Sequence, residues 1–409
     1  MSLRENANKI MNAALAAALP DAAVQAALEK AQFSDGKVIL IAAGKAGWQM
    51  AKAAHDQMGD RIHGGVVVTK YDHSKGPIAN LDIYEAGHPV PDANSFRGTQ
   101  AAIDAVTGLS ENDTVLFLLS GGGSALFEKP LIPEEDLNRL TKQLLACGAD
   151  IVEMNTVRKR FSAVKGGRFA QLCQPAKVFT IVLSDVLGDR LDMIASGPAY
   201  PDSSTTEDAK RIVQKYNLTL TGDMESLLLA ETPKELGNVE THITGSVRQL
   251  CISAEKTCRE LGYEPVTLTD RLCCTARDAG VFLSNIARYY GDSGKKLAFL
   301  VGGETVVHLT GHGLGGRNQE LALAAADGIA GMNACVFSVG SDGTDGPTDA
   351  AGGYVDGTTA ATLKAQGILI SDVLQDNDAY HALQKCDGLI ITGATGTNVN
   401  DISVLLIGE

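Results

Sequence analysis

Short, continuous apolar runs alternate with amphipathic helical stretches along the sequence, and this alternation limits the possible folds most. Apolar runs rich in β-branched residues occupy 38–43, 65–69, 81–85, 114–119 and 177–183. Helical stretches are predicted at 4–19, 22–31, 44–58, 95–109 and 134–152. Buried strands separated by helices are typical of a parallel sheet covered on both faces. The first part of the chain is therefore predicted to be an α/β domain.

A second series of strands and helices follows a charged, glycine-poor segment at 208–240. We expect strands at 241–243, 296–301, 305–310, 333–339 and 388–392, and helices at 246–261 and 277–290. Because 409 residues exceed the size of a single core, two domains are expected. The boundary is placed near residue 236, which gives domains 1–236 and 237–409. The apolar run 402–407 is a further strand that fits either domain.

Glycine is enriched, at 44 of 409 residues, and its clusters stand where the predicted strands end. The loops that leave these strands are 43–45, 120–124, 184–189 and 341–346. In open α/β sheets, ligands bind at the carboxyl ends of the strands, where glycine lets the backbone approach them closely. We therefore predict one ligand site in a cleft between the two domains.

Charge and composition exclude several classes of function. With 35 basic and 49 acidic residues the net charge is −14, which provides no general surface for nucleic acid or anionic membranes. No run reaches the ~18 apolar residues of a membrane span. The eight cysteines show no C-x-x-C spacing and the histidines no metal-ligand spacing. We expect a soluble cytoplasmic protein with reduced thiols, no zinc chemistry and a local site for any anionic substrate.

A triple glycine is the first candidate for such a site. Gly121, Gly122 and Gly123 stand between Ser120 and Ser124, directly after a predicted buried strand. Consecutive free N–H groups and a helix N-terminus bind anions without any charged side chain. The alternative is a tight turn from strand to helix. We favour the anion site because one glycine would suffice for the turn.

Isolated cations are the second candidate. Lys45 is predicted in the first turn of a helix, where the helix dipole disfavours a cation unless an anion binds there. The alternative is a lysine that faces solvent. Asn155, Arg158 and Lys165 belong to the one basic block of this acidic protein. That block either positions phosphate or forms a solvated helix face.

Acidic residues follow the ends of several predicted strands. Asp185 and Asp189 lie in one such loop, and Asp342, Asp345, Asp349 and Asp401 lie in later loops. Loop carboxylates suit Mg²⁺, which takes one or two protein oxygens together with water and phosphate oxygens. The alternative is turn formation, which aspartate favours. We expect about half of these acids to serve turns alone.

The segment 311–316 matches the pattern G-x-G-x-x-G of nicotinamide-binding folds. The match is weak, because that pattern expects an acid about 20 residues further on, whereas Asp342 stands roughly 30 residues from Gly311. Arg317 also follows, where a pyrophosphate site usually needs no cation. An NAD(P)H-dependent reductase is the alternative that rests on this segment.

Many short motifs match one known family in order. They lie at 43–46, 88–92, 120–125, 155–158, 165–167, 184–186, 196–198, 302–305, 315–320, 342–346 and 395–401. The chain thus resembles the glycerate 2-kinases of the MOFRL type, some of which carry the older label hydroxypyruvate reductase. The resemblance implies a Rossmann-like N-terminal domain, a smaller α/β C-terminal domain and a site between them. It also implies ATP- and Mg²⁺-dependent phosphorylation of the 2-hydroxyl of D-glycerate to 2-phosphoglycerate.

The resemblance also implies roles for particular residues. Lys45 and Arg317 correspond to catalytic cations. Gly315 and Gly316, which directly precede Arg317, are predicted to bind substrate or phosphate. We expect an alanine variant of either cation to lose turnover and fold normally. Asp189 is the first candidate and Asp345 the second for accepting the hydroxyl proton, on loop position alone.

Further predictions concern ligands and partners. The predicted metal ligands are Asp185, Asp342 and Asp345, and the predicted partners are glycerate and a nucleotide, with no nucleic acid or membrane. The oligomeric state stays open, with a homodimer as one option. Two rivals remain: an NAD(P)H-dependent hydroxypyruvate reductase, and a protein that binds sugar acids or nucleotides without turnover.

Overall fold

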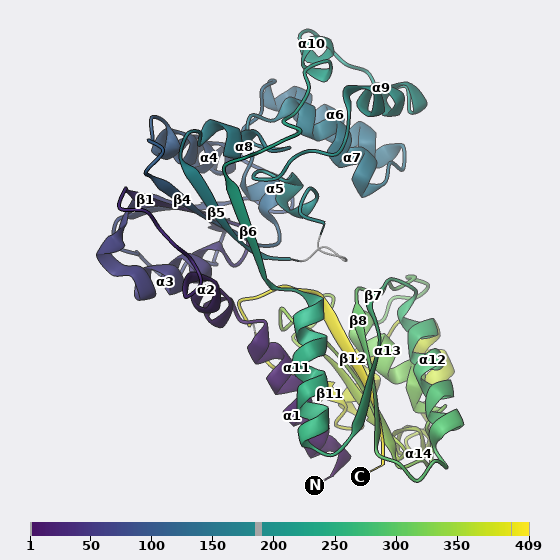
Figure 1. The fold of residues 1–409 in the computed structure, drawn as a ribbon. Helices are drawn as coiled ribbons and strands as arrows, with labels where there is room; N and C mark the ends of the chain where they lie inside the picture. The colour runs from purple at the N-terminus through teal and green to yellow at the C-terminus, as the bar shows by residue number, and fades with distance from the viewer. Residues whose placement is uncertain (1, 185–189, 394, 409) are drawn as a thin grey trace. The chain divides into compact units, whose positions relative to one another are not determined.

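The computed structural model describes residues 2–184, 190–393 and 395–408. The chain divides into two compact units, one made of residues 20–244 and the other of residues 1–19 together with 245–409. Each unit is built on its own six-stranded sheet flanked by helices (Figure 1). The predicted two-domain α/β class is confirmed.

The sheet of unit 20–244 has the strand order β3-β2-β1-β4-β5-β6. Its strands are β1 (Val38–Ala43), β2 (Ile62–Lys70), β3 (Leu81–Ala86), β4 (Thr114–Leu119), β5 (Lys177–Leu183) and β6 (Val239–Gly245). The β1–β2, β1–β4, β2–β3 and β4–β5 pairs are all parallel. All five strands predicted for this part of the chain are confirmed. The run 241–243, expected to open the second domain, instead lies in edge strand β6 beside β5.

The helices of this unit follow the predicted order with one break. They are α2 (Pro20–Leu28), α3 (Gly47–Met58), α4 (Ala93–Val106), α5 (Gly123–Leu126), α6 (Glu134–Ala146), α7 (Ile151–Arg158), α8 (Arg168–Leu172), α9 (Thr206–Lys215) and α10 (Met224–Leu228). The single helix expected at 134–152 is interrupted between α6 and α7. Gly148, with φ 73°, lies just after α6, and Asp150 caps the start of α7 together with Glu153.

The second unit contains a mixed sheet in the order β11-β10-β9-β12-β8-β7. Its strands are β7 (Glu264–Leu272), β8 (Leu297–Gly303), β9 (Ala334–Gly340), β10 (Gly352–Asp356), β11 (Leu389–Ile390) and β12 (Asp401–Ile407). The strand β12 lies antiparallel between β8 and β9, which assigns the final apolar run to this unit. The prediction of a strand at 305–310 is wrong, because this segment forms only a single bridge at Val306.

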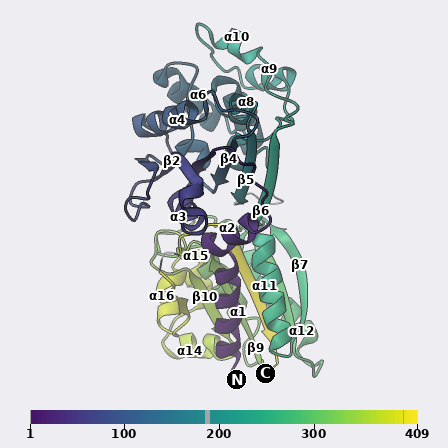
Figure 2. The same ribbon diagram turned by 60° about the vertical axis from the view of Figure 1, so that its left-hand side comes forward.

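The helices of the second unit include the N-terminal one. They are α1 (Leu3–Ala17), α11 (Val247–Glu260), α12 (Ala276–Tyr290), α13 (Arg317–Ala326), α14 (Thr359–Ala365), α15 (Ile370–Gln375) and α16 (Ala379–Gln384). Helix α1 runs beside α11 in both views (Figures 1 and 2). The Ser253 hydroxyl donates to the carbonyl of Ala13 at 2.9 Å. The compact units therefore differ from the predicted ranges 1–236 and 237–409 at the N-terminal helix and at β6.

Among the described residues, no single helix is long and apolar enough to cross a membrane. Helices α1 and α2 meet the length and composition criterion only as a pair, which is bent by 50°.

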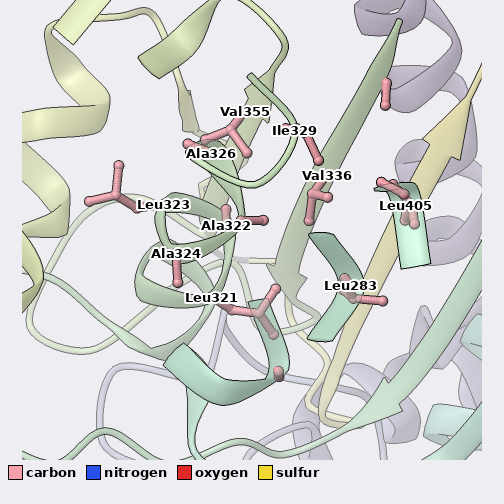
Figure 3. Close-up of a cluster of buried hydrophobic side chains, with 14 of the residues drawn as sticks. Leu283, Leu321, Ala322, Leu323, Ala324, Ala326, Ile329, Val336, Val355 and Leu405 are labelled. Carbon is pink, nitrogen blue, oxygen red and sulfur yellow. The ribbon is translucent and has the colours of Figure 1, made fainter. Parts of the chain in front are cut away.

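Helix α13 is the buried centre of the second unit. Its residues from Asn318 to Ala326 are all buried, and most are small or apolar. Figure 3 shows Leu321 and its neighbours among Leu283 of α12, Val336 of β9 and Leu405 of β12. Because close-packed interiors have low compressibility, this core fixes the position of the first residue of α13, Arg317.

Candidate functional site

In unit 20–244, the loops that follow the neighbouring strands β1 and β4 are joined to each other. The Ser120 hydroxyl accepts a hydrogen bond from the backbone N–H of Ala46 at 3.0 Å, and the N–H of Lys45 donates to the carbonyl of Gly121 at 2.8 Å. A Cβ added to Gly44 would lie 2.2 Å from the Ser120 oxygen, and φ at Gly44 is +128°. Glycine at this position therefore allows the two loops to meet.

The triple glycine leaves its amide groups available. Gly122, with φ +85°, caps α5, which spans only four residues. The N–H groups of Gly121, Gly122 and Gly123 donate no hydrogen bond to any part of the chain that the structure describes. A turn that served only to connect β4 with α5 would not need three free donors. The geometry is consistent with the anion site.

Lys45 lies in the turn before α3 rather than in its first turn, because the helix begins at Gly47 with Ala46 as its N-cap. Its carbonyl oxygen lies 2.8 Å from Nδ1 of His73. Within the described ranges, its half-buried ammonium group makes no ion pair or hydrogen bond. A Cβ added to Gly122 would lie 3.1 Å from Cγ of Lys45, so this side chain passes over the glycine loop.

His88 lies over the same loop. The same added Cβ on Gly122 would lie 3.1 Å from Cδ2 of the His88 ring. Burial, reinforced by the nearby Lys45, Lys70 and His73, lowers the pKa of His88 to about 4. The imidazole is therefore neutral near pH 7. Its motif 88–92 was noted in the sequence, but no chemical signal there separated a site residue from a structural one.

Some cations of the basic block are held in ion pairs within the protein, whereas another is available to bind an anion. Lys159 forms a buried ion pair with Asp202 at 3.0 Å, and Arg160 pairs with Glu231 at 3.1 Å. Arg158, the last residue of α7, has no ion-pair partner among the described residues, and its Nε is buried without a hydrogen bond. Arg158 is therefore the member of the block that is free to bind an anion.

Lys165 is enclosed by the protein. Its side chain is fully buried, pairs with Glu128, and donates a hydrogen bond to the carbonyl of Ser124 at 2.6 Å. Burial lowers the pKa of Lys165 to about 8, while Glu128 opposes this shift. These contacts favour a supporting role under the glycine loop rather than direct contact with phosphate.

Two further predicted residues belong to a hydroxyl chain beside this ion pair. The Ser124 Oγ lies 3.0 Å from the Ser196 Oγ, and the Ser196 hydroxyl donates to Oδ1 of Asn155 at 3.1 Å. The structure thus brings Ser124 and Asn155 together through Ser196. Ser196 was not a predicted site residue, since only the fold places it between the other two.

In the second unit, Arg317 is held by two acids. Its Nε and Nη2 donate to the carboxylate of Asp401 at 2.5 and 3.0 Å, and its Nη1 lies 3.0 Å from Oε1 of Glu304. These partners raise the pKa of Arg317, although burial opposes the shift. Burial raises the pKa of Asp401, and Arg317 opposes that shift. Arg317 begins α13, Asp401 begins β12, and Glu304 directly follows β8. Asp401 pairs with Gly303, so the two acids lie at the same end of these antiparallel strands.

Asp345 caps α13 from another loop. Its carboxylate accepts hydrogen bonds from the backbone N–H groups of Asn318 and Gln319 at 3.2 and 2.9 Å. Burial raises the pKa of Asp345 to about 6, while these two hydrogen bonds oppose the shift. A Cβ added to Gly316 would lie 2.3 Å from the Asp345 carboxyl carbon, which explains glycine there. The contacts favour a helix cap over a metal ligand or a base.

Of the three predicted metal ligands, Asp342 is the one whose carboxylate the structure leaves available to Mg²⁺. Asp185 and Asp189 lie outside the described residues. Asp342 is partly exposed and uses Oδ1 to accept the N–H of Thr344 at 3.0 Å, which leaves Oδ2 available. Within the described ranges there is no group of three or more His, Cys, Asp or Glu side chains placed to hold a metal. The described residues thus fit a metal ion held mainly by ligand phosphates, with Asp342 as one protein oxygen donor.

The loop at 311–316 is closed to a pyrophosphate. The backbone N–H groups of Gly311, His312 and Leu314 donate to the side chains of Asn377, Asp376 and Asp378 at 2.9–3.0 Å. The N–H of Gly313 donates to the carbonyl of Asp376. A dinucleotide site would need these donors unoccupied. The loop instead carries the chain to Arg317 through Gly315, whose carbonyl would lie 2.5 Å from a Cβ added to Gly346.

Comparisons with known proteins agree with this description. Residues 6–229 match the model of a domain of unknown function, DUF4147, and residues 297–401 match the MOFRL family. The chain is 53% identical to the D-glycerate 2-kinase of Thermotoga maritima over 99% of both chains. It is 39% identical to a putative hydroxypyruvate reductase of Agrobacterium vitis, over 91% of this chain and all of that one. The crystal structure of the Thermotoga maritima glycerate kinase superimposes with a TM-score of 0.96, at 52% identity and 99% coverage of each chain.

Proposed function

Because the chain belongs to the glycerate 2-kinase family with a MOFRL domain, we propose that it phosphorylates the 2-hydroxyl of D-glycerate to give 2-phosphoglycerate. The observation that carries the proposal is 53% identity over the full length of a D-glycerate 2-kinase. A kinase of this kind takes its phosphoryl group from a nucleotide, and we propose ATP with Mg²⁺. Glycerate and the nucleotide are then the small-molecule partners.

The groups of unit 20–244 suit the demands of phosphoryl transfer, which are mainly positioning and charge neutralisation. Lys45 and Arg158 are cations without a counter-ion among the described residues. Because the protein as a whole is acidic, we propose that these two uncompensated cations serve an anionic ligand. The free N–H groups of the glycine loop add donors next to Lys45. We propose that this set binds the glycerate carboxylate and phosphate oxygens.

Arg317 differs because its charge is already compensated by Asp401 and Glu304. We propose that it acts through orientation: a guanidinium fixed in advance stabilises charge that develops on the transferring group. The predicted cleft that would unite Arg317 with Lys45 stays a prediction.

Mg²⁺, when bound, neutralises nucleotide phosphates, and we propose that Asp342 contributes one oxygen to it. Asp189 stays the proposed acceptor of the hydroxyl proton. The contacts of Asp345 make it a weaker candidate for that role. A homodimer and a cytoplasmic location also stay predictions.

A coupled assay separates the proposal from its rivals. Purified protein with ATP, Mg²⁺ and a panel of 2-hydroxy acids should release ADP with D-glycerate as the preferred acceptor. NADH oxidation that depends on hydroxypyruvate, without ADP release, would establish the reductase. A ligand-induced rise in melting temperature without any product would establish a binding protein. The occupied donors of loop 311–316 support the kinase over the reductase.

A further inference from the structure

A left-handed turn is packed against the glycine loop. Ala195, Ser196 and Gly197 have φ values of 50°, 62° and 65°. The side chains of Ala195 and Ser196 are buried. L-residues adopt this conformation as single residues and rarely in succession. Backbone strain of this kind persists where the surrounding structure enforces it, and it concentrates at functional sites.

Ala195 and Ser196 differ in what their side chains do. The Ala195 methyl belongs to the apolar core and packs on the loop, since a Cβ added to Gly123 would lie 2.6 Å from it. The Ser196 side chain makes the two hydroxyl contacts to Ser124 and Asn155. Glycine would adopt the same backbone at no steric cost. The presence of serine rather than glycine at position 196 is therefore explained by the contacts of its hydroxyl group.

The backbone of the turn also fixes the segment that carries Lys165. The Ser196 carbonyl accepts the N–H of Gly166 at 3.1 Å, and the Gly197 carbonyl accepts the N–H of Gly167 at 2.7 Å. Four segments therefore meet at Ser196: the glycine loop, α7, the turn after Lys165 and the left-handed turn itself.

We infer that Ser196 is a positioning residue for phosphoryl transfer, which acts by fixing Ser124 and Asn155. Through Ser124 it holds the end of the glycine loop, and through Asn155 it holds the face of α7 that carries Arg158 one turn later. The inference rests on the proposed function, since it assigns these groups to the transfer site. Ser196 itself need not touch a substrate.

The variant Ser196→Gly tests the inference because it keeps the left-handed backbone and removes only the hydroxymethyl group. We expect kcat/KM for D-glycerate to fall by about 10–100-fold, because small displacements of positioned groups are costly. We expect the melting temperature to stay unchanged or to rise by roughly 2–4 °C, because the strain is relieved. A merely structural serine would give the opposite pattern, a lower melting temperature with normal kinetics.

Two comparisons complete the test. Asn217→Gly relieves a left-handed residue with φ 49° after α9, and its kinetics should match the wild type. The double variant Ser124→Ala with Ser196→Gly should be no slower than the slower single variant, because Ser196→Gly already removes the contact that Ser124→Ala removes. A kcat/KM of Ser196→Gly within about twofold of wild type, or a lowered melting temperature, would overturn the inference.

Failure of the proposed function would be recognised separately. If the wild type transfers no phosphoryl group to glycerate, inorganic phosphate serves as the probe for the same loop. A phosphate-induced rise in melting temperature that is present in the wild type and lost in Ser196→Gly would still support the positioning role. An equal rise in both proteins, or none in either, would overturn it.

Discussion

The guanidinium of Arg317 donates two parallel hydrogen bonds to the carboxylate of Asp401, from Nε at 2.5 Å and from Nη2 at 3.0 Å. The Asp401 side chain is 7% exposed, whereas that of Arg317 is 33% exposed. Arg317 therefore has a structural duty in addition to any role in catalysis. Removing it leaves a buried carboxylate without its cation.

The first prediction follows from this pair. Arg317→Ala should lose turnover and also lower the free energy of unfolding by about 2–3 kcal/mol, less than a fully buried pair because the guanidinium is partly exposed. Urea denaturation measures the loss. The same measurement tests the sequence-based expectation that the variant folds normally.

A second substitution separates the structural role of Arg317 from its proposed catalytic role. Adding Asp401→Asn to Arg317→Ala removes the stranded charge, so stability should recover while turnover does not. Recovery of turnover in the double variant would contradict a direct role for Arg317.

Lys45 should behave differently, because its ammonium group has no partner within the described ranges. Lys45→Met keeps the apolar stem and removes the charge, so kcat should fall by at least about 100-fold with an unchanged melting temperature. The matched control is Lys52→Met on α3, which breaks only an exposed pair with Asp56. Similar kinetics for both variants would refute the role of Lys45.

The basic block provides an internal comparison. Arg158→Gln should lower kcat/KM by about 10–100-fold and leave the fold intact, because Arg158 has no ion-pair partner among the described residues. Lys159→Met strands the buried carboxylate of Asp202 and should cost about 3–5 kcal/mol of stability. Kinetics and urea denaturation of both variants test this. Destabilisation by Arg158→Gln would mean that its charge has a structural use.

Strands β4 and β5 were predictable because each is a nearly continuous apolar run flanked by turn residues. Strand β7 was missed, because as an edge strand it is largely exposed and mixes polar with apolar residues. The segment 305–310 has the composition of a strand but finds only a one-residue bridge beside Thr275. Whether each of these two segments forms a strand depends on its pairing with other strands, which its own sequence does not reveal.

The candidate site was predictable as a set of loops but not as a set of contacts. The order of strands places Ser120 next to Lys45, which follows from parallel topology. Sequence alone does not distinguish Arg158, which stays free, from Lys165, which is enclosed with Glu128. That difference arises from which acids the fold brings near each cation.

His88 gives a prediction for pH dependence. Its folded-state pKa of about 4 lies below the ordinary 6.5, so between these pH values the unfolded chain binds a proton that the folded chain does not. This contribution to stability is complete above pH 6.5 and is lost as the pH falls towards 4. Urea unfolding at pH 7 and pH 5 should show wild type losing more stability than His88→Gln. An equal loss in both proteins would contradict the lowered pKa.

The reaction proposed for this protein is the transfer of a phosphoryl group to the 2-hydroxyl of D-glycerate. Its most direct test is NMR of the product formed from ATP, Mg²⁺ and D-glycerate, with phosphorus correlated to the protons of the glycerate chain. Phosphorylation of the 2-hydroxyl predicts coupling to the proton on C2, together with stoichiometric ADP. Coupling to the protons on C3, or no phosphorylated acid at any enzyme concentration, would contradict it.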